Sequence, residues 1–175
     1  MFNKYFRYTL AMLFMFCIFK GCSEKDPDKY YNSKDKYAIK FPRQWKIKEG
    51  YKGTSVTALC PEMGSTKQFH DKVYIVVDQI PSGIKVSKYF EGFENEMSKT
   101  IKDYHEIEKG DATIADEDAK WFTFMESNGI DNLKNKIYLI KHDNRIYTIT
   151  FTSTSDNYSQ YSNRFEAIVL SFEFE

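Results

Sequence analysis

Histidine and carboxylate side chains occur close together near residue 105, and such groups can bind a metal ion or transfer protons. His105 is followed by Glu106 and Glu108 in a segment that alternates like a β-strand. Successive side chains of a strand point to opposite faces of its sheet. We therefore expect His105 on one face and both glutamates on the other, which predicts no metal site there.

Two further groups carry ligand-type side chains. His70 and Asp71 precede an apolar run, and we expect them in a solvated polar loop. An acidic group lies in one turn region, but it lacks the loop spacing and the glycine of an EF-hand calcium site. We expect an ordinary acidic hairpin there; the residues are Asp111, Asp116, Glu117 and Asp118.

Signatures of nucleophilic and phosphate chemistry are missing from the sequence. It contains no G-x-S-x-G, no H-E-x-x-H and no glycine-rich phosphate loop. Cys60 ends an apolar run, which predicts a buried, unreactive thiol. Trp45 and Trp121 are expected to pack in the core or at its rim, although an exposed tryptophan could anchor a partner. The sequence thus predicts no catalytic residue, metal or cofactor, and a protein that is not an enzyme.

The N-terminal 21 residues are typical of a bacterial secretion signal. Lys4 and Arg7 give a cationic start, and residues 8–19 follow without a charge. As a helix these twelve residues would span roughly 18 Å, short of the roughly 30 Å hydrocarbon core of a bilayer. The residues before Cys22 resemble a bacterial lipobox, in which the cysteine after a small residue is acylated. Gly21 fits that pattern, whereas Lys20 departs from it.

We therefore expect residues 1–21 to be a signal peptide and Cys22 to carry the lipid that attaches the chain to a membrane. Cleavage without lipidation and an uncleaved anchor are the alternatives. Residues 22–36 are charged and turn-rich, which predicts a flexible tether. Such a tether would span about 20 Å as a coil and at most roughly 45 Å. Ser23 follows the cysteine where aspartate favours the inner membrane, so we expect the outer membrane of the cell envelope.

The charge balance argues against nucleic acid as a partner. The full chain has 25 basic and 25 acidic side chains, and the signal segment contains three of the basic ones and none of the acidic ones. The mature chain is therefore slightly acidic and has no basic excess to neutralise phosphates. The aromatic side chains, 15 Phe, 13 Tyr and 2 Trp, are enough for a compact core without disulfides.

We expect residues 37–175 to form one domain of strands and two helices. Alternating or β-rich segments predict strands before and after a helix at 87–103, whose apolar side chains recur at helical spacing. A second amphipathic helix follows, capped by Ser155 or Asp156. Short connections require antiparallel neighbours, so the prediction is α+β, an antiparallel sheet of about six to seven strands flanked by helices. The expected strands are 37–41, 45–48, 54–60, 72–80, 106–114, 119–126, 135–141 and 145–152.

Four segments resemble the PsbP-like family, which includes bacterial lipoproteins of the DcrB type. They are the phenylalanine-proline-tryptophan element at 41–45, the strand segments 121–124 and 145–151, and the closing helix at 165–172. The resemblance covers residues 37–172 and implies an α-β-α sandwich with an accessory role. The resulting expectation is a membrane-tethered, non-catalytic lipoprotein of the bacterial envelope that binds a protein partner. The alternative is a carrier of a small hydrophobic ligand, suggested by the aromatic content.

Overall fold

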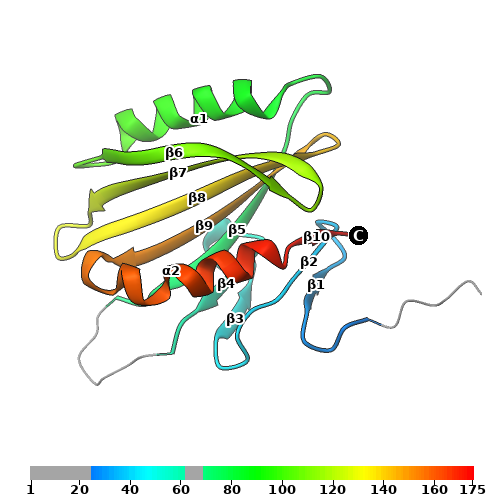
Figure 1. The fold of residues 1–175 in the computed structure, drawn as a ribbon, viewed down its shortest axis with the longest axis horizontal. Helices are drawn as coiled ribbons and strands as arrows, with labels where there is room; N and C mark the ends of the chain where they lie inside the picture. The colour runs from blue at the N-terminus through cyan, green and yellow to red at the C-terminus, as the bar shows by residue number, and fades with distance from the viewer. Residues whose placement is uncertain (1–24, 62–68) are drawn as a thin grey trace, which may run out of the picture.

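The computed structural model describes residues 25–61 and 69–175. A seven-stranded antiparallel sheet runs in the order β3-β4-β5-β9-β8-β7-β6 (Figure 1). Its strands are β3 (Lys46–Glu49), β4 (Val56–Leu59), β5 (Lys72–Gln79), β6 (His105–Ile114), β7 (Glu117–Ser127), β8 (Asn132–His142) and β9 (Arg145–Thr154). The predicted class and strand number are confirmed. A 3-10 turn, η1 (Tyr51–Gly53), separates β3 from β4.

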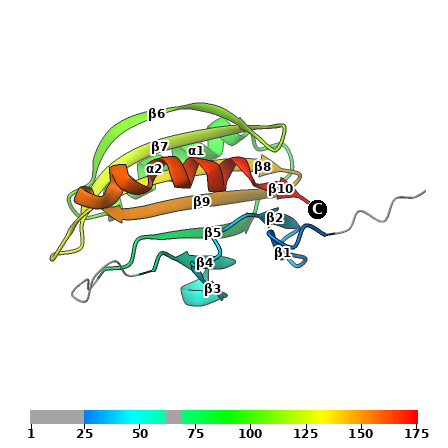
Figure 2. The same cartoon turned by 60° about the horizontal axis from the view of Figure 1, so that its bottom comes forward.

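The two helices cover opposite faces of this sheet. Helix α1 (Val86–Thr100) lies on one face, and α2 (Ser155–Leu170) crosses the other (Figures 1 and 2). Period-two alternation explains this, because neighbouring residues of a strand enter different cores. In β9, for example, Ile146 packs in the α1 core, whereas Tyr147 and Ile149 pack in the α2 core. Each helix therefore completes one apolar layer, as the resemblance implied.

A small second sheet lies at the C-terminal end of α2 (Figure 2). It has the order β1-β2-β10 and consists of β1 (Tyr30–Asn32), β2 (Tyr37–Ile39) and β10 (Glu173–Phe174). Tyr37 is fully buried here, with its ring stacked 5.4 Å from that of Phe172. Segments from the two ends of the described chain thus form one unit.

The expected tether at 22–36 differs from the structure in its described part. Tyr30–Asn32 forms a strand paired with β2, although the segment is highly charged. The reason is aromatic packing, since the Tyr30 ring lies 6.3 Å from Tyr37 and 6.1 Å from Phe41. Residues 1–24, including the predicted signal segment and Cys22, lie outside the described residues.

Candidate functional site

A groove of about 650 Å³ lies where the N-terminus of α1 faces the turn between β6 and β7. Lysines 85, 120 and 141 line it together with Asp111, Glu117 and Asp118, and Ile84 and Val86 add apolar surface. No side chain caps α1 at Lys85, and the first turn of the helix has no acidic residue. The groove therefore offers both charge signs and backbone N–H groups at a helix end.

The acidic group predicted from sequence forms the hairpin at the rim of this groove. Ala115 and Asp116 occupy the two turn positions with φ of 51° and 63°, as a two-residue hairpin loop requires. Asp111 forms an ion pair with Lys120, and Glu117 Oε1 lies 2.7 Å from His142 Nδ1. These side chains therefore pair with basic partners. Among the described residues, no group of three potential metal ligands was found.

The prediction for His105 is wrong in one respect. The pairing of β6 with β7 shifts between Glu106 and Glu108, so a β-bulge at Ile107 interrupts the alternation. Glu106 pairs with Phe124, which belongs to the α1 core, whereas Glu108 pairs with Thr123. Successive residues of a strand face opposite ways, so the two glutamates lie on opposite faces.

Glu106 instead takes part in a contact between β6 and α1. Lys109 Nζ lies 2.6 Å from Glu94 Oε1 and 3.3 Å from Glu106 Oε2. A hydrogen bond between the two carboxyl groups raises the pKa of Glu106 and lowers that of Glu94. The three side chains thus act as a polar clamp between helix and sheet, which we call the α1 clamp.

Asp71 is not in a solvated loop, contrary to the prediction. Its side chain is buried and lies at the N-terminus of α2. Oδ1 accepts hydrogen bonds from Ser153 Oγ (2.7 Å) and the Thr154 backbone N–H (3.3 Å), and Oδ2 accepts one from Asn157 Nδ2 (3.3 Å). A carboxylate here also interacts favourably with the helix dipole. The N-cap residue is Thr154 and not Ser155 or Asp156, and its side chain makes no cap hydrogen bond; Asp71, distant in sequence, instead anchors the residues around the start of the helix.

The remaining predicted residues serve packing. Cys60 is buried as expected, and its backbone N–H donates to the Asp71 carbonyl. Trp45 is buried in the α2 core, and Trp121 packs at the rim of that core. The Trp121 ring lies against Gly110, and its Nε1 donates to the Asp111 carbonyl at 3.3 Å. Both tryptophans therefore occupy the packing positions expected from sequence.

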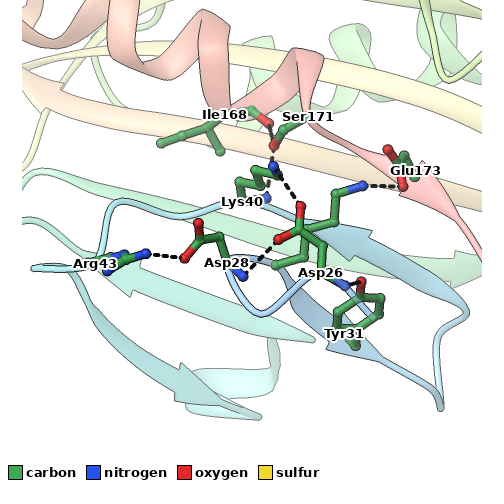
Figure 3. A network of polar contacts seen from close by, with 9 residues as sticks. Asp26, Asp28, Tyr31, Lys40, Arg43, Ile168, Ser171 and Glu173 are labelled. Atoms are coloured by element: carbon green, nitrogen blue, oxygen red, sulfur yellow. Dashed lines mark hydrogen bonds and ion pairs between the residues drawn. The ribbon is translucent and has the colours of Figure 1, made fainter. Parts of the chain in front are cut away.

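Sequence reasoning missed a network that holds residues 25–29, here called the N-terminal strap (Figure 3). Asp26 Oδ2 lies 2.7 Å from Lys40 Nζ, and Asp28 Oδ1 lies 2.6 Å from Arg43 Nη2. Lys29 forms an ion pair with Glu173. The only signal in the sequence was the mixture of basic and acidic residues at 25–29, and such a mixture also suits a solvated linker.

From the strap, the network continues to the end of α2. The Lys40 backbone N–H donates to Ser171 Oγ at 2.9 Å, and Ser171 Oγ donates to the Ile168 carbonyl at 2.6 Å (Figure 3). The strap is thus linked to the C-terminal segment of the domain. Among helices in the described part of the chain, none combines the length and apolar character that a membrane span needs.

The fold and these contacts define a two-sheet α+β domain whose ligand-type side chains largely support packing. The sequence profile of the PsbP-like protein family matches residues 22–174. The chain therefore belongs to the PsbP-like family, as the resemblance indicated. No curated protein matched the chain.

Solved structures share the fold at low identity. Cyanobacterial PsbP from Synechocystis sp. PCC 6803 is 13% identical with a TM-score of 0.63, covering 84% of this chain and 91% of its own. LpqN of Mycobacterium tuberculosis, involved in cell envelope biogenesis, is 9% identical with a TM-score of 0.66 and coverages of 83% and 88%. The Saccharomyces cerevisiae Ran-binding protein Mog1p is 6% identical with a TM-score of 0.55 and coverages of 83% and 94%.

Proposed function

We propose that this protein is a non-catalytic accessory lipoprotein of the bacterial cell envelope, tethered through Cys22, that binds a protein partner in the groove beside α1. The groove is the observation that carries the proposal, because three lysines, three acidic residues and apolar side chains line one concave surface. Family membership and the likeness to LpqN, a protein of cell envelope biogenesis, support the accessory role and the location.

The polar contacts support a non-catalytic role. A general base needs a side chain that can reach the substrate, in hydrogen-bond range of the proton it removes. The Asp71 carboxylate is occupied by donors from the start of α2, and Glu117 bonds the ring of His142. That ring also stacks on Phe174 at 4.0 Å. These acid–base groups therefore stabilise the fold.

The chemistry of the groove favours a polypeptide over a small apolar ligand. Opposite charges at its walls suit side chains of both signs, and electrostatic complementarity gives specificity in protein interfaces. The uncapped N–H groups at the start of α1 suit an acidic side chain of the partner. The carrier alternative is less well supported, because aromatic rings such as Phe90 and Phe122, 5.6 Å apart, fill the space between α1 and the sheet.

Site-specific photocrosslinking in the native envelope tests this proposal. A photoreactive amino acid at Lys120, in the groove, is compared with one at Ile130, which is 78% exposed in the turn between β7 and β8. We expect a defined protein adduct from position 120 that is lost on double replacement of Lys85 and Lys141 by glutamate. Equal labelling from both positions, or none across several growth conditions, would contradict a partner site in the groove.

A further inference from the structure

The strap fixes the point at which the chain leaves the folded domain. Its ion pairs with Lys40, Arg43 and Glu173 are joined by a hydrogen bond from the Asp26 backbone N–H to the Tyr31 hydroxyl at 2.7 Å. Lys25 Nζ also lies 3.4 Å from Glu175 Oε1. The attachment therefore begins at residues 25–26 rather than at residue 37.

Chain length then limits how far the domain can stand from a lipid on Cys22. Four residue steps separate Cys22 from Asp26, and an extended chain covers at most about 14 Å over that length. The tether expected from sequence reached roughly 45 Å. An anchored domain with the strap in place must therefore lie directly at the lipid headgroups.

The surface at this end of the molecule fits such a position. Leu170 is 73% exposed, and it adjoins Ser171, which holds Lys40 beneath the strap. The charged side chains of the strap network are matched in sign, because its basic and acidic groups pair with one another. A leucine at the interface, with balanced charges in the strap network, gains apolar contact without needing anionic lipid.

We propose that the strap docks the end of the domain bearing Leu170 onto the lipid surface, so that the tether orients the domain as well as retaining it. This rests on the proposed acylation of Cys22. The occupant is the lipid surface itself, because the anchored chain is too short to admit a folded protein between the strap and the bilayer.

Depth-dependent fluorescence quenching on the purified full-length lipoprotein tests this. Two variants in a Cys60→Ala background, Leu170→Cys and Ile130→Cys, are labelled with an environment-sensitive fluorophore and reconstituted in phosphatidylethanolamine vesicles with a minority of phosphatidylglycerol. Both residues are highly exposed, at 73% and 78%, and Ile130 lies in the turn before β8, near the start of α2. We expect nitroxide lipids to quench the label at 170 several-fold more than that at 130.

The second part of the experiment uses a strap variant, Lys29→Gln with Lys40→Gln, which removes two of the ion pairs of the strap. It should reduce quenching at position 170 toward the level at 130 while the protein still floats with the vesicles. Lys88→Gln, which removes an exposed ion pair with Glu91 on α1, is the matched control and should change nothing. Thermal melting of each variant checks that the domain remains folded.

The intact mass of the same preparation shows whether residue 22 is acylated, and so distinguishes a wrong orientation from a missing lipid anchor. Equal, weak quenching at both positions, with an acylated residue 22, would overturn the docked orientation but leave the tether intact. Unchanged quenching in the strap variant would show that the strap does not set the orientation. An unmodified residue 22 would remove the anchor, and the proposed function and the orientation would fail together.

Discussion

The two faces of the large sheet are built differently. On one face, α2 buries five side chains, and its N-terminus is held by Asp71 from the start of β5. On the other, α1 buries only Phe90. Its other apolar side chains are half-buried, as with Tyr89 and Phe93, whose rings stack 6.1 Å apart.

This difference suggests different roles for the two faces: the α2 face stabilises the fold, and the α1 face borders the groove proposed to bind a partner. The α2 core also contains residues of the small sheet, so it joins both sheets and both ends of the described chain. The α1 layer is a thinner cover whose N-terminus borders the groove. Elements with few buried contacts open at lower free energy than the core. We therefore expect the α2 face to determine the free energy of unfolding and the α1 face to tolerate change.

The largest predicted difference comes from truncating one phenylalanine on each helix. Phe165 is 1% exposed and lies 5.0 Å from the ring of Phe151, so Phe165→Ala should destabilise the protein by about 3–5 kcal/mol. Phe93→Ala on α1 should cost only about 1–2 kcal/mol, because that ring is already partly in water. Urea unfolding of the soluble domain measures both. Equal losses would show that the faces contribute alike.

Removal of the Asp71 carboxylate at the start of α2 should have the next largest effect. Asp71→Ala leaves buried Ser153 and the Thr154 backbone N–H without their acceptor, and we expect a loss of about 2–3 kcal/mol. Asp71→Asn retains an acceptor oxygen but removes the charge at the helix end, so a smaller loss of about 1 kcal/mol is expected. Urea midpoints at constant slope measure both. A loss for Asp71→Ala no larger than for Asp71→Asn would contradict a stabilising role of the hydrogen bonds that Asp71 accepts.

Sequence reasoning captured the local pattern of this fold and missed its long-range polar contacts. Strands β5 to β9 and both helices follow from period-two and helical spacing, which neighbouring residues determine. The role of Asp71 depends on Ser153, 82 residues away, so nothing near Asp71 in sequence reveals it. Charged composition predicted a solvated segment at 22–36, but Tyr30 supplies enough aromatic contact to order β1.

The bulge at Ile107 shows a second limit of prediction from sequence periodicity. Strict alternation placed Glu106 and Glu108 on one face, and a single extra residue in β6 separates them. Bulges carry no reliable local signature when glycine is absent from the position. The sequence likewise revealed only part of the groove, because its acidic residues come from one hairpin whereas Lys85 and Lys141 come from distant elements.

Replacing one glycine on each face by alanine should change the stability by a smaller amount and in opposite directions. A Cβ at Gly110 would lie 3.0 Å from Trp121 Cε2, and the indole is held by Asp111 and by Lys136 Nζ, 4.4 Å from its centroid. Gly110→Ala should therefore destabilise by about 1–2 kcal/mol. Gly92→Ala on α1 meets no atom within 4 Å and should stabilise the helix by about 0.5–1 kcal/mol. Changes in Tm of opposite sign are expected, and a shared sign would contradict this assignment.

The smallest predicted effect concerns the α1 clamp and depends on pH. The hydrogen bond with Glu94 raises the pKa of Glu106 above 4.5, so this group stabilises the fold fully below 4.5 and loses its contribution as pH rises through the raised pKa. The lowered pKa of Glu94 acts in the opposite sense: its contribution is present above 4.5 and is lost as pH falls through that lowered pKa. The pair therefore prefers the state in which Glu106 alone carries the proton.

Glu106→Gln fixes that arrangement at every pH above the lowered pKa of Glu94, because an amide can donate to the Glu94 carboxylate without titrating. We expect the Tm of the variant, relative to the parent, to rise as pH increases through the raised pKa of Glu106, by an amount equivalent to less than about 1 kcal/mol at this exposed site. Glu91→Gln is the matched control, since it also replaces one carboxylate of a surface ion pair by an amide, on α1 where Glu91 faces Lys88 and not β6. A difference in Tm that does not vary with pH would show that the hydrogen bond between Glu94 and Glu106 does not couple α1 to β6, and the ion pair between Lys109 and Glu94 would then be the part of the clamp that joins them.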